Sequence, residues 1–575
     1  MSDPDDWFSP FPVRIPGIRM YATASELLGE PAPEEIRIGF WRQLSIEQAL
    51  SLIAQILTDI EVHSTLSDGP VEDVDRRWAA KVRNCRLRTR LQIGSTFGVR
   101  LFAPQMLLLA AKEALLYCRD GPVADTTEGL DQLVICLLGI ADDRDEGPKD
   151  AGGETWGGMD VSLASELIAN LHFNRTLWVG RQLVWFERTW FRDWPKRTKA
   201  VETVGGEPYE LFKEATGVEL VDFAAIAFSL YTQASVHGYV RFPDEFFAKL
   251  GLPTEAVEHF LAVTSYPVSE LRRLIRDDAA SSGSSRFQFD DFRRYPLVRL
   301  ESGHLLMLSS NFVMQRALSE TTFWDVRQHL RNIDPKREVA FHQCTRDILE
   351  HETGAALRRI FLKKKLPVLD EERLRKRLAA GRKNMPRICD YAIRSGQTWL
   401  LIEVTERAMP RPVVFANASS SVLDDELDKV LTARKAQQLV STISLLEEEA
   451  RLQGDKNYTY IPLVLTGETG LPWNIPVQRR VQERLASLGH PEEFCTSVAL
   501  ITLKELIMLE NAAALGHDII EILHSWRRDS PFRSLDQHLE HRTIPLNSPK
   551  WERNRVSEVV NSFARRMGWS DAGLK

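Results

Sequence analysis

The spacing of apolar residues along the chain changes near residue 335. Before that point, segments such as 46–62 and 103–118 place apolar residues three and four positions apart, which predicts amphipathic helices. The Ser- and Gly-rich segment 276–287 is the best candidate for a linker. The sequence therefore predicts a mainly α-helical N-terminal domain over residues 1–285.

Residues 286–334 predict a small hairpin followed by helices, a connecting region. From 335 to 575, helical patterns alternate with short apolar runs, and the two longest predicted helices cover 336–361 and 423–449. The predicted strands are 366–369, two strands within 386–405, 458–466 and 497–503. Helices and strands in this order predict an α/β domain with a mixed sheet covered by helices.

Composition places the chain among multidomain globular proteins. Its 575 residues are too many for one ordinary core, and its 43% hydrophobic and 27% charged residues are typical of a soluble protein. The six cysteines are scattered without the spacing of a zinc site, which favours reduced thiols. No apolar run approaches the roughly 20 residues of a membrane helix, and the acidic N-terminus is not a signal peptide. We expect a cytoplasmic protein without a membrane partner.

Two acidic residues stand out in the apolar hairpin pattern of residues 386–405. Asp390 and Glu403 are equidistant from the Gly396–Gln397 bond, and strand alternation about a turn at Ser395-Gly396 puts both carboxylates on one face. In a regular hairpin their Cβ atoms would lie roughly 4.5–5.5 Å apart. Because opposed like charges are destabilising, a cation between them is expected, and a divalent metal ion is the simplest one.

These two acids and the order of elements resemble the PD-(D/E)XK, or restriction-endonuclease-like, nuclease superfamily over residues 335–525. In that pattern an Asp lies on one central strand and E-x-K on the next. The resemblance implies that Asp390 and Glu403 hold Mg²⁺ or Mn²⁺, which polarises a phosphodiester and generates the attacking hydroxide. It therefore implies a metal-dependent endonuclease in the C-terminal domain.

The sequence departs from the superfamily pattern at the lysine of E-x-K, where Thr405 stands. Some members supply this lysine from the following helix, and Lys435 is the candidate here. It interrupts an apolar stripe formed by Leu427, Leu431, Leu439 and Ile443. A lysine on a core-facing stripe needs a partner, and the two carboxylates could be that partner. The alternative is that Lys435 lies at the stripe edge and reaches water.

The superfamily often adds a glutamate from the first helix of the domain. Glu338 and Glu352 share one face of the helix predicted over 336–361. Glu338 is the favoured candidate, and a solvated surface charge is the alternative.

A basic segment precedes the hairpin and is the candidate nucleic-acid interface. Residues 358–383 hold eleven Lys and Arg against three acids, a local excess of eight positive charges in a chain of net charge −7. No aromatic residue is interleaved in 366–383, so contact with a duplex DNA backbone suits it better than stacking. A solvated charged helix is the alternative. The candidate contacts, with Gln438 added from the face of Lys435, are Lys363, Lys364, Lys365, Arg373, Lys376, Arg377, Arg382, Lys383 and Gln438.

Three interpretations remain open from the sequence, one of which is an unrelated helical scaffold in which the acid pair is a coincidence. The first is an active endonuclease, a build that resembles bacterial restriction or anti-phage effectors by analogy of fold. The second is a catalytically inactive relative that binds nucleic acid or protein, which Thr405 favours. In either class the N-terminal domain would bind a substrate, a partner or a trigger. Its Trp-rich segment 165–195 predicts core packing, with a partner-binding face as the alternative.

Overall fold

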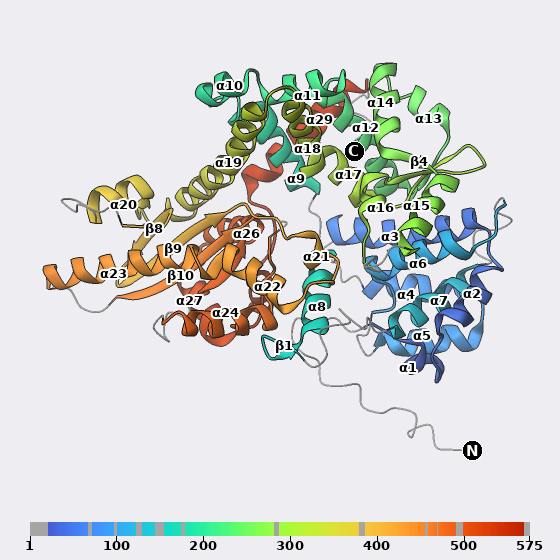
Figure 1. Cartoon of the computed structure of the whole chain (residues 1–575), viewed down its shortest axis with the longest axis horizontal. Helices are drawn as coiled ribbons and strands as arrows, with labels where there is room; N and C mark the ends of the chain where they lie inside the picture. The colour runs from blue at the N-terminus through green and yellow to red at the C-terminus, as the bar shows by residue number, and fades with distance from the viewer. Residues whose placement is uncertain are drawn as a thin grey trace.

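The computed structural model is a mixed α/β protein in which helices predominate (Figure 1). It describes residues 21–66, 72–96, 100–121, 129–143, 154–173, 179–280, 287–378, 386–454, 458–467, 470–489 and 498–568. Three hydrophobic clusters form its interior. The predicted domain boundaries at 285 and 335 stay predictions, because segments far apart in the sequence share these clusters.

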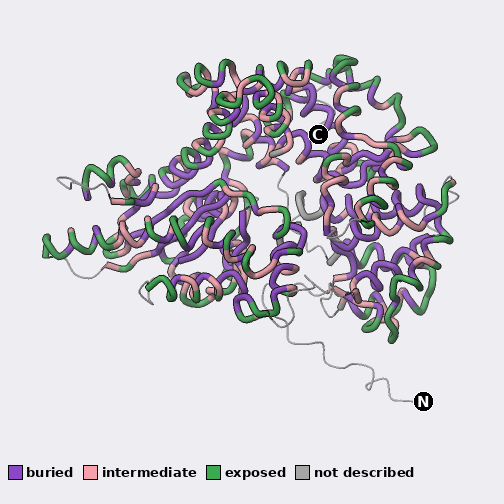
Figure 2. Tube along the Cα trace, in the orientation of Figure 1, coloured by how far each residue is buried: buried purple, intermediate pink, exposed green. Residues whose placement is uncertain are grey.

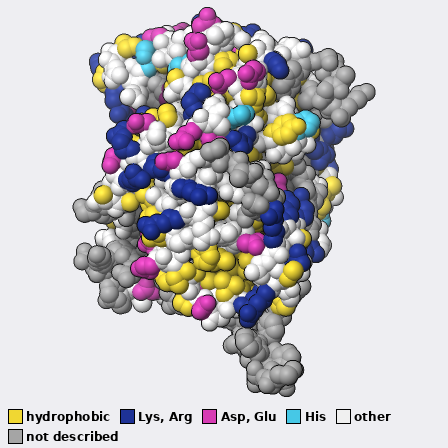
Figure 3. Space-filling view, turned by 90° about the vertical axis from the view of Figure 1, so that its right-hand side faces the viewer, with side chains coloured by type: hydrophobic (Ala, Val, Ile, Leu, Met, Phe, Trp, Pro, Cys, Tyr) yellow, Lys and Arg dark blue, Asp and Glu magenta, His cyan; other side chains and the backbone are white. Residues whose placement is uncertain are grey.

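The first cluster is built mainly by the N-terminal helices, on the right of Figure 1. These are α1 (Ala24–Leu28), α2 (Glu34–Trp41), α3 (Ile46–Leu66), α4 (Glu72–Lys81), α5 (Cys85–Thr96), α6 (Pro104–Tyr117) and α7 (Leu130–Asp142). The helical spacing predicted for 46–62 is confirmed, since Leu50, Ile53 and Leu57 are buried along α3. On the outer face of this region, side chains of both charge signs are interspersed (Figure 3).

The second cluster is built by the middle helices of the chain, along the top of Figure 1. Its helices are α9 (Val179–Glu187), the π-helix η2 (Arg188–Asp193), α10 (Thr198–Val204), α11 (Pro208–Thr216), α12 (Leu220–His237), α13 (Asp244–Ala248), α14 (Thr254–Thr264), α17 (Ser310–Leu318) and α18 (Glu320–Ile333). Two helices from this part of the chain, α15 (Val268–Ala280) and α16 (Asp290–Arg294), pack with the first cluster. The strands β1 (Thr155–Trp156) and β2 (Met159–Asp160) and the helix α8 (Val161–Phe173) pack mainly with the third cluster, described below. Trp190 and Trp194 are fully buried, so the part of the Trp-rich segment that the structure describes packs into the interior.

A small four-stranded sheet connects the first two clusters. Its strands lie in the order β3-β6-β5-β4 and are β3 (Arg241–Phe242), β4 (Ser265–Pro267), β5 (Leu297–Arg299) and β6 (Leu305–Met307). The hairpin predicted within 286–334 is confirmed as the antiparallel pair β5 and β6. The strands β3 and β4 were not predicted, because two or three residues are too few to show alternation.

The third cluster surrounds a five-stranded sheet in the order β11-β10-β9-β8-β7. The strands are β7 (Val368–Asp370), β8 (Tyr391–Ser395), β9 (Thr398–Thr405), β10 (Thr459–Thr466) and β11 (Ala499–Thr502). The pairs β7–β8 and β8–β9 are antiparallel, whereas β9–β10 and β10–β11 are parallel. The mixed sheet predicted from the sequence is therefore confirmed, and its central strands are buried (Figure 2).

Helices cover both faces of this sheet. They are α19 (Pro335–Phe361), α20 (Glu371–Leu378), α21 (Arg411–Val414), α22 (Ser420–Leu427), η3 (Asp428–Thr432), α23 (Lys435–Gln453), α24 (Ile475–Ser487), α26 (Leu503–Ala514), α27 (Ile519–Asp529) and α28 (Leu535–His541). Glu403 of β9 contacts Lys435 of α23. Thr398, which belongs to the other set of alternating positions in β9, contacts His524 of α27. Because successive strand residues face opposite ways, α23 and α27 cover opposite faces.

The helix predicted over 423–449 is wrong in one respect, because it is interrupted. The π-helical turn η3 separates α22 from α23, and no Gly or Pro marks the break in the sequence. The wider turn is held by side-chain contacts at Asp428, which pairs with Arg484 and accepts a hydrogen bond from Thr432. Such turns are frequent at functional sites.

The last helix, α29 (Lys550–Arg566), follows the sheet in sequence but packs with the second cluster. Phe563 lies against Phe228 of α12, with 5.5 Å between ring centroids, and Glu552 pairs with Arg181 of α9 at 3.0 Å. The end of the described chain thus ties the middle helices to the region of the sheet.

Among the described residues, no single helix is long and apolar enough to cross a membrane. One pair of segments, Lys199–Thr216 and Leu220–His237, meets the length and composition criteria only when taken together, and it is bent by 75°.

Candidate functional site

The hairpin β8–β9 has the register predicted from its sequence. Tyr391 pairs with Ile402, so Asp390, one residue before β8, lies opposite Glu403. Gly396 adopts a left-handed conformation (φ 61°) in the turn, which a glycine adopts without steric cost. The short turn therefore fixes which residues face each other, and it brings the two acids together.

Backbone hydrogen bonds link the two carboxylates across the hairpin. The amide of Asp390 donates to Glu403 Oε2 at 3.3 Å, and the amide of Val404 donates to Asp390 Oδ2 at 2.7 Å. Glu403 is fully buried in the sheet. The pair is thus part of a rigid, desolvated strand end.

Lys435 reaches this pair from the first turn of α23. Its Nζ donates to Glu403 Oε1 at 2.6 Å and to the carbonyl oxygen of Val404 at 2.8 Å. The lysine side chain is 16% exposed and the glutamate 0%. Lys435 thus finds its partner in the carboxylate of Glu403, as one of the two sequence hypotheses predicted, and does not extend into water.

The apolar stripe around Lys435 explains how the ammonium is brought inward. Leu427, Leu431 and Leu439 are fully buried, so the helical face that carries Lys435 points at the sheet. The stripe continues through η3 despite the wider turn. Gln438, one turn on, donates to the carbonyl of Ile388 at 3.4 Å and so contacts the segment that leads into Asp390.

The carboxyl groups have raised pKa values. Burial, followed by the charge of Asp390, raises the pKa of Glu403 to about 8, although Lys435 acts in the opposite direction. Burial also raises the pKa of Asp390, with Lys435 and the Val404 amide opposing it. One ammonium therefore does not balance two desolvated carboxylates, and the site favours additional positive charge.

Glu350 of α19 is a third acid near the pair. Its backbone carbonyl accepts a hydrogen bond from the Tyr391 hydroxyl at 2.8 Å, which ties α19 to the start of β8. Burial, followed by the charge of Asp390, raises the pKa of the Glu350 carboxyl to about 7. The Glu350 side chain is exposed, so this carboxyl is accessible to solvent.

Glu338, the glutamate favoured from the sequence, is not brought to the pair. It is buried against Arg327 and Arg331, which lower the pKa of its carboxyl. Twelve residues of α19 separate it from Glu350, about 18 Å along the helix axis. Glu352, the other candidate, pairs with Arg188 at 2.5 Å and with Arg359 at 2.9 Å. Both Glu338 and Glu352 are therefore paired with arginines. The acid of α19 that lies near Asp390 is Glu350, which the sequence did not single out.

We expect Glu350→Gln to weaken Mn²⁺ binding roughly tenfold, because the carboxylate adds negative charge beside Asp390 without replacing it. Calorimetric titration of Mn²⁺ measures this change. Glu372→Gln is the matched control, since Glu372 is an exposed glutamate that pairs only with Lys376 in the described contacts. Equal Mn²⁺ affinity of Glu350→Gln and the control would exclude Glu350 from the site.

The oxygen atoms of the site suit a hard divalent cation. Asp390, Glu403 and the Val404 carbonyl supply oxygen ligands only, and Mg²⁺ typically binds one or two carboxylates and completes its shell with water or phosphate. Lys435 Nζ already contacts two of these oxygens, so a cation is tolerated at that position. Within the described residues, no cluster of three or more His, Cys, Asp and Glu side chains is placed to hold a metal ion. A cation here would therefore depend on water and substrate oxygens.

Thr405, which replaces the lysine of E-x-K, is buried at the end of β9 and lines a cavity beside Lys435. Its side chain carries no positive charge, so the nearest ammonium to the carboxylates comes from α23. An ammonium therefore lies beside Glu403 although Thr405, two residues further along β9, is uncharged.

Most of the basic side chains predicted to bind nucleic acid are engaged within the protein. Lys364 pairs with Asp518 at 2.7 Å, Lys376 with Glu372 at 2.6 Å and Arg377 with Glu449 at 2.8 Å. Lys363 donates to the Ala514 carbonyl and Arg373 to the Val368 carbonyl, whereas Lys365 is exposed. Arg382 and Lys383 lie outside the described residues. Fewer positive charges of this segment are therefore available to bind phosphate than the sequence suggested.

Comparisons with protein-family models, with curated proteins and with solved structures give no match for this chain. The site is therefore interpreted from its own geometry.

Proposed function

We propose that this protein is a metal-dependent endonuclease that hydrolyses phosphodiester bonds in nucleic acid, with DNA favoured over RNA. The observation that carries the proposal is the contact of Lys435 Nζ with Glu403, opposite Asp390 in the hairpin. Two carboxylates and an ammonium at the end of a buried strand are the groups that such a reaction uses. A mixed sheet, with β8 and β9 antiparallel and β9 and β10 parallel, holds these groups at the end of its central strand.

In this proposal each residue has a separate role. Asp390 and Glu403 would hold a Mg²⁺ or Mn²⁺ ion, which when bound would supply Lewis-acid chemistry at the phosphate and its attacking water. Lys435 holds the carboxylate of Glu403 in place and offsets the negative charge of the phosphate under attack. Burial of Glu403 strengthens both interactions, since charges attract more strongly away from water.

A second candidate is a protein that binds nucleic acid or another protein without cutting it. The observation that favours it is the same lysine contact, because Lys435 Nζ occupies Glu403 Oε1 and the Val404 carbonyl, which a metal ion would also use. In that case the ammonium is a permanent replacement for the metal. A role as a restriction or anti-phage effector remains a prediction under either candidate.

The test is incubation of plasmid DNA and a structured RNA with the purified chain, with Mg²⁺ or Mn²⁺ and with EDTA. We expect cleavage of DNA that requires the metal and stops when EDTA removes it. Cleavage that persists in EDTA would contradict a metal-dependent site. Binding of DNA without cleavage under any metal condition would favour the second candidate.

A further inference from the structure

Two cavities flank the carboxylate pair, and Arg434 lines both of them. The α19 cavity, of about 280 Å³, lies between α19, the end of β9 and the start of α23, and its charged lining includes Arg346, Lys429 and Lys435. The α20 cavity, of about 360 Å³, lies between α20, the segment before Asp390 and α23. Lys435 lines the α19 cavity, and residues 386–388, which lead into Asp390, line the α20 cavity. The carboxylate pair therefore lies between the two cavities.

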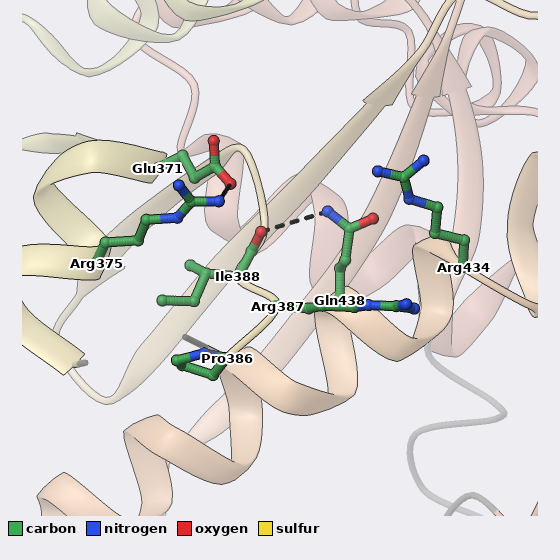
Figure 4. A pocket seen from close by; sticks show the side chains of 7 residues that line it. All are labelled: Glu371, Arg375, Pro386, Arg387, Ile388, Arg434 and Gln438. Carbon is green, nitrogen blue, oxygen red and sulfur yellow. Dashed lines mark hydrogen bonds and ion pairs between the residues drawn. The ribbon is translucent and has the colours of Figure 1, made fainter. Parts of the chain in front are cut away.

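The α20 cavity is drawn in Figure 4. Arg434 and Gln438 project from α23 on one side, and Glu371 and Arg375 from α20 form the other. Arg387 comes from the segment between the two helices, and its guanidinium donates to the Gln437 side chain at 2.9 Å. Three arginines and one glutamate thus line this cavity.

The α19 cavity is more strongly cationic. Its lining has five basic residues against one acidic residue, Glu406: Arg346, Arg407, Lys429, Arg434 and Lys435. A cavity with this balance attracts anions, and its concave walls reinforce the field.

Two of these cations have no partner in the part of the chain that the structure describes. Arg407 pairs with Glu426, and Lys429 with Asp425. In contrast, the guanidinium groups of Arg346 and Arg434 make no hydrogen bond or ion pair with the described residues, and both side chains are exposed. Each is therefore free to bind an anion without first breaking a contact.

We propose that Arg434 and Arg346 bind phosphate groups of a nucleic-acid backbone that crosses from the α20 cavity to the α19 cavity. This inference rests on the proposed function and names the path of its substrate. The planar guanidinium fork can contact two phosphate oxygens at once. A strand on this path would pass the carboxylate pair.

The path differs from the one that the sequence favoured. The basic segment 358–383 is largely paired with acids and carbonyls of the protein, whereas Arg346 and Arg434 come from two other helices that the fold brings together. Burial raises the pKa of the Asp390 carboxyl, and the charge of Arg434 is among those that oppose this shift, so Arg434 lies near the site.

The experiment measures binding of a short fluorescein-labelled DNA duplex, and of RNA with the same sequence, by anisotropy in EDTA. The variants are Arg434→Gln and Arg346→Gln, with Arg373→Gln for the basic segment. The control is Arg273→Gln, since Arg273 is an exposed arginine on α15 that pairs with Glu270. We expect each cavity variant to bind DNA roughly tenfold more weakly. The slope of log affinity against log salt should fall by about 1 for each.

The outcomes separate this inference from the proposed function, because binding is measured without metal and cleavage is measured on the same variants with Mg²⁺. Weaker binding in both cavity variants, with unchanged binding in the control, supports the path whether or not the wild type cuts. Unchanged binding in the cavity variants overturns it even if the wild type is an active nuclease. Equal losses in Arg373→Gln and Arg434→Gln, or no binding by the wild type, overturn it as well.

Discussion

Replacement of Glu403 by glutamine is expected to abolish metal-dependent cleavage, with a loss of roughly 10²- to 10³-fold or more. Glutamine keeps the size of the side chain but cannot supply the charge that holds a divalent cation. The fold should persist, because glutamine has the same shape and its amide oxygen can still accept the hydrogen bond from Lys435 Nζ. Rates of plasmid cleavage and urea unfolding measure the two effects.

The matched substitutions for this prediction are Asp390→Asn and Glu372→Gln. Asp390 faces Glu403 in the hairpin, so its amide variant should lose cleavage to a similar extent. Glu372 is exposed on α20, and its replacement should leave the rate unchanged. Full activity of Glu403→Gln would show that the carboxylate pair is not the active site.

Replacement of Lys435 by methionine is expected to have the second largest effect, because it changes both activity and stability. Cleavage should fall by roughly 10²-fold or more, since the phosphate loses the nearest fixed ammonium. The folded state should lose stability as well, because two desolvated carboxylates remain without their cation. Methionine fits the apolar stripe of α23, so the protein should still fold.

The change in stability should depend on pH. In the wild type, the pKa of Glu403 is raised from 4.5 to about 8, so the native state binds more protons than the unfolded state between these values. Stability therefore falls as pH rises through this window, by up to about 1.4 kcal/mol per pH unit. In Lys435→Met the pKa of Glu403 should rise further, because Lys435 lowers it in the wild type. The free energy of unfolding of this variant should therefore continue to fall above pH 8.

Urea unfolding between about pH 5 and pH 9 measures this dependence. The free energy of unfolding of Lys435→Met should keep falling above pH 8, where that of the wild type no longer changes through ionisation of Glu403. Glu403→Gln should lack this part of the pH dependence altogether. Lys213→Met, which replaces an exposed lysine paired with Glu219, controls for loss of a surface charge. A curve for Lys435→Met parallel to that of the wild type would contradict the coupling between Lys435 and Glu403.

Local patterns in the sequence were enough to predict the carboxylate hairpin and its lysine. Strand alternation and a two-residue turn fix the register of β8 and β9, so the positions of Asp390 and Glu403 followed from their distances to Gly396. The lysine at 435 was recognisable because it breaks an otherwise apolar stripe. Both features depend on residues close together in the chain.

Features that depend on contacts distant in sequence could not be predicted in this way. Glu350 is one of several acids along α19, and only the hydrogen bond from Tyr391 shows that this turn of the helix meets β8. The basic segment looked available for phosphate because its partners, such as Asp518 and Glu449, lie far along the chain. The π-helical turn at Asp428 has no Gly or Pro to mark it.

Calorimetric titration of Mn²⁺ into the wild-type chain shows whether Asp390, Glu403 and Lys435 form a site for a divalent cation. We expect binding that strengthens as pH rises toward 8, with a proton released from Glu403 and detected in buffers of different ionisation enthalpy. Asp390→Asn and Glu403→Gln should remove most of the binding. Absence of Mn²⁺ binding by the wild type, or binding that both variants retain, would show that these residues do not form such a site.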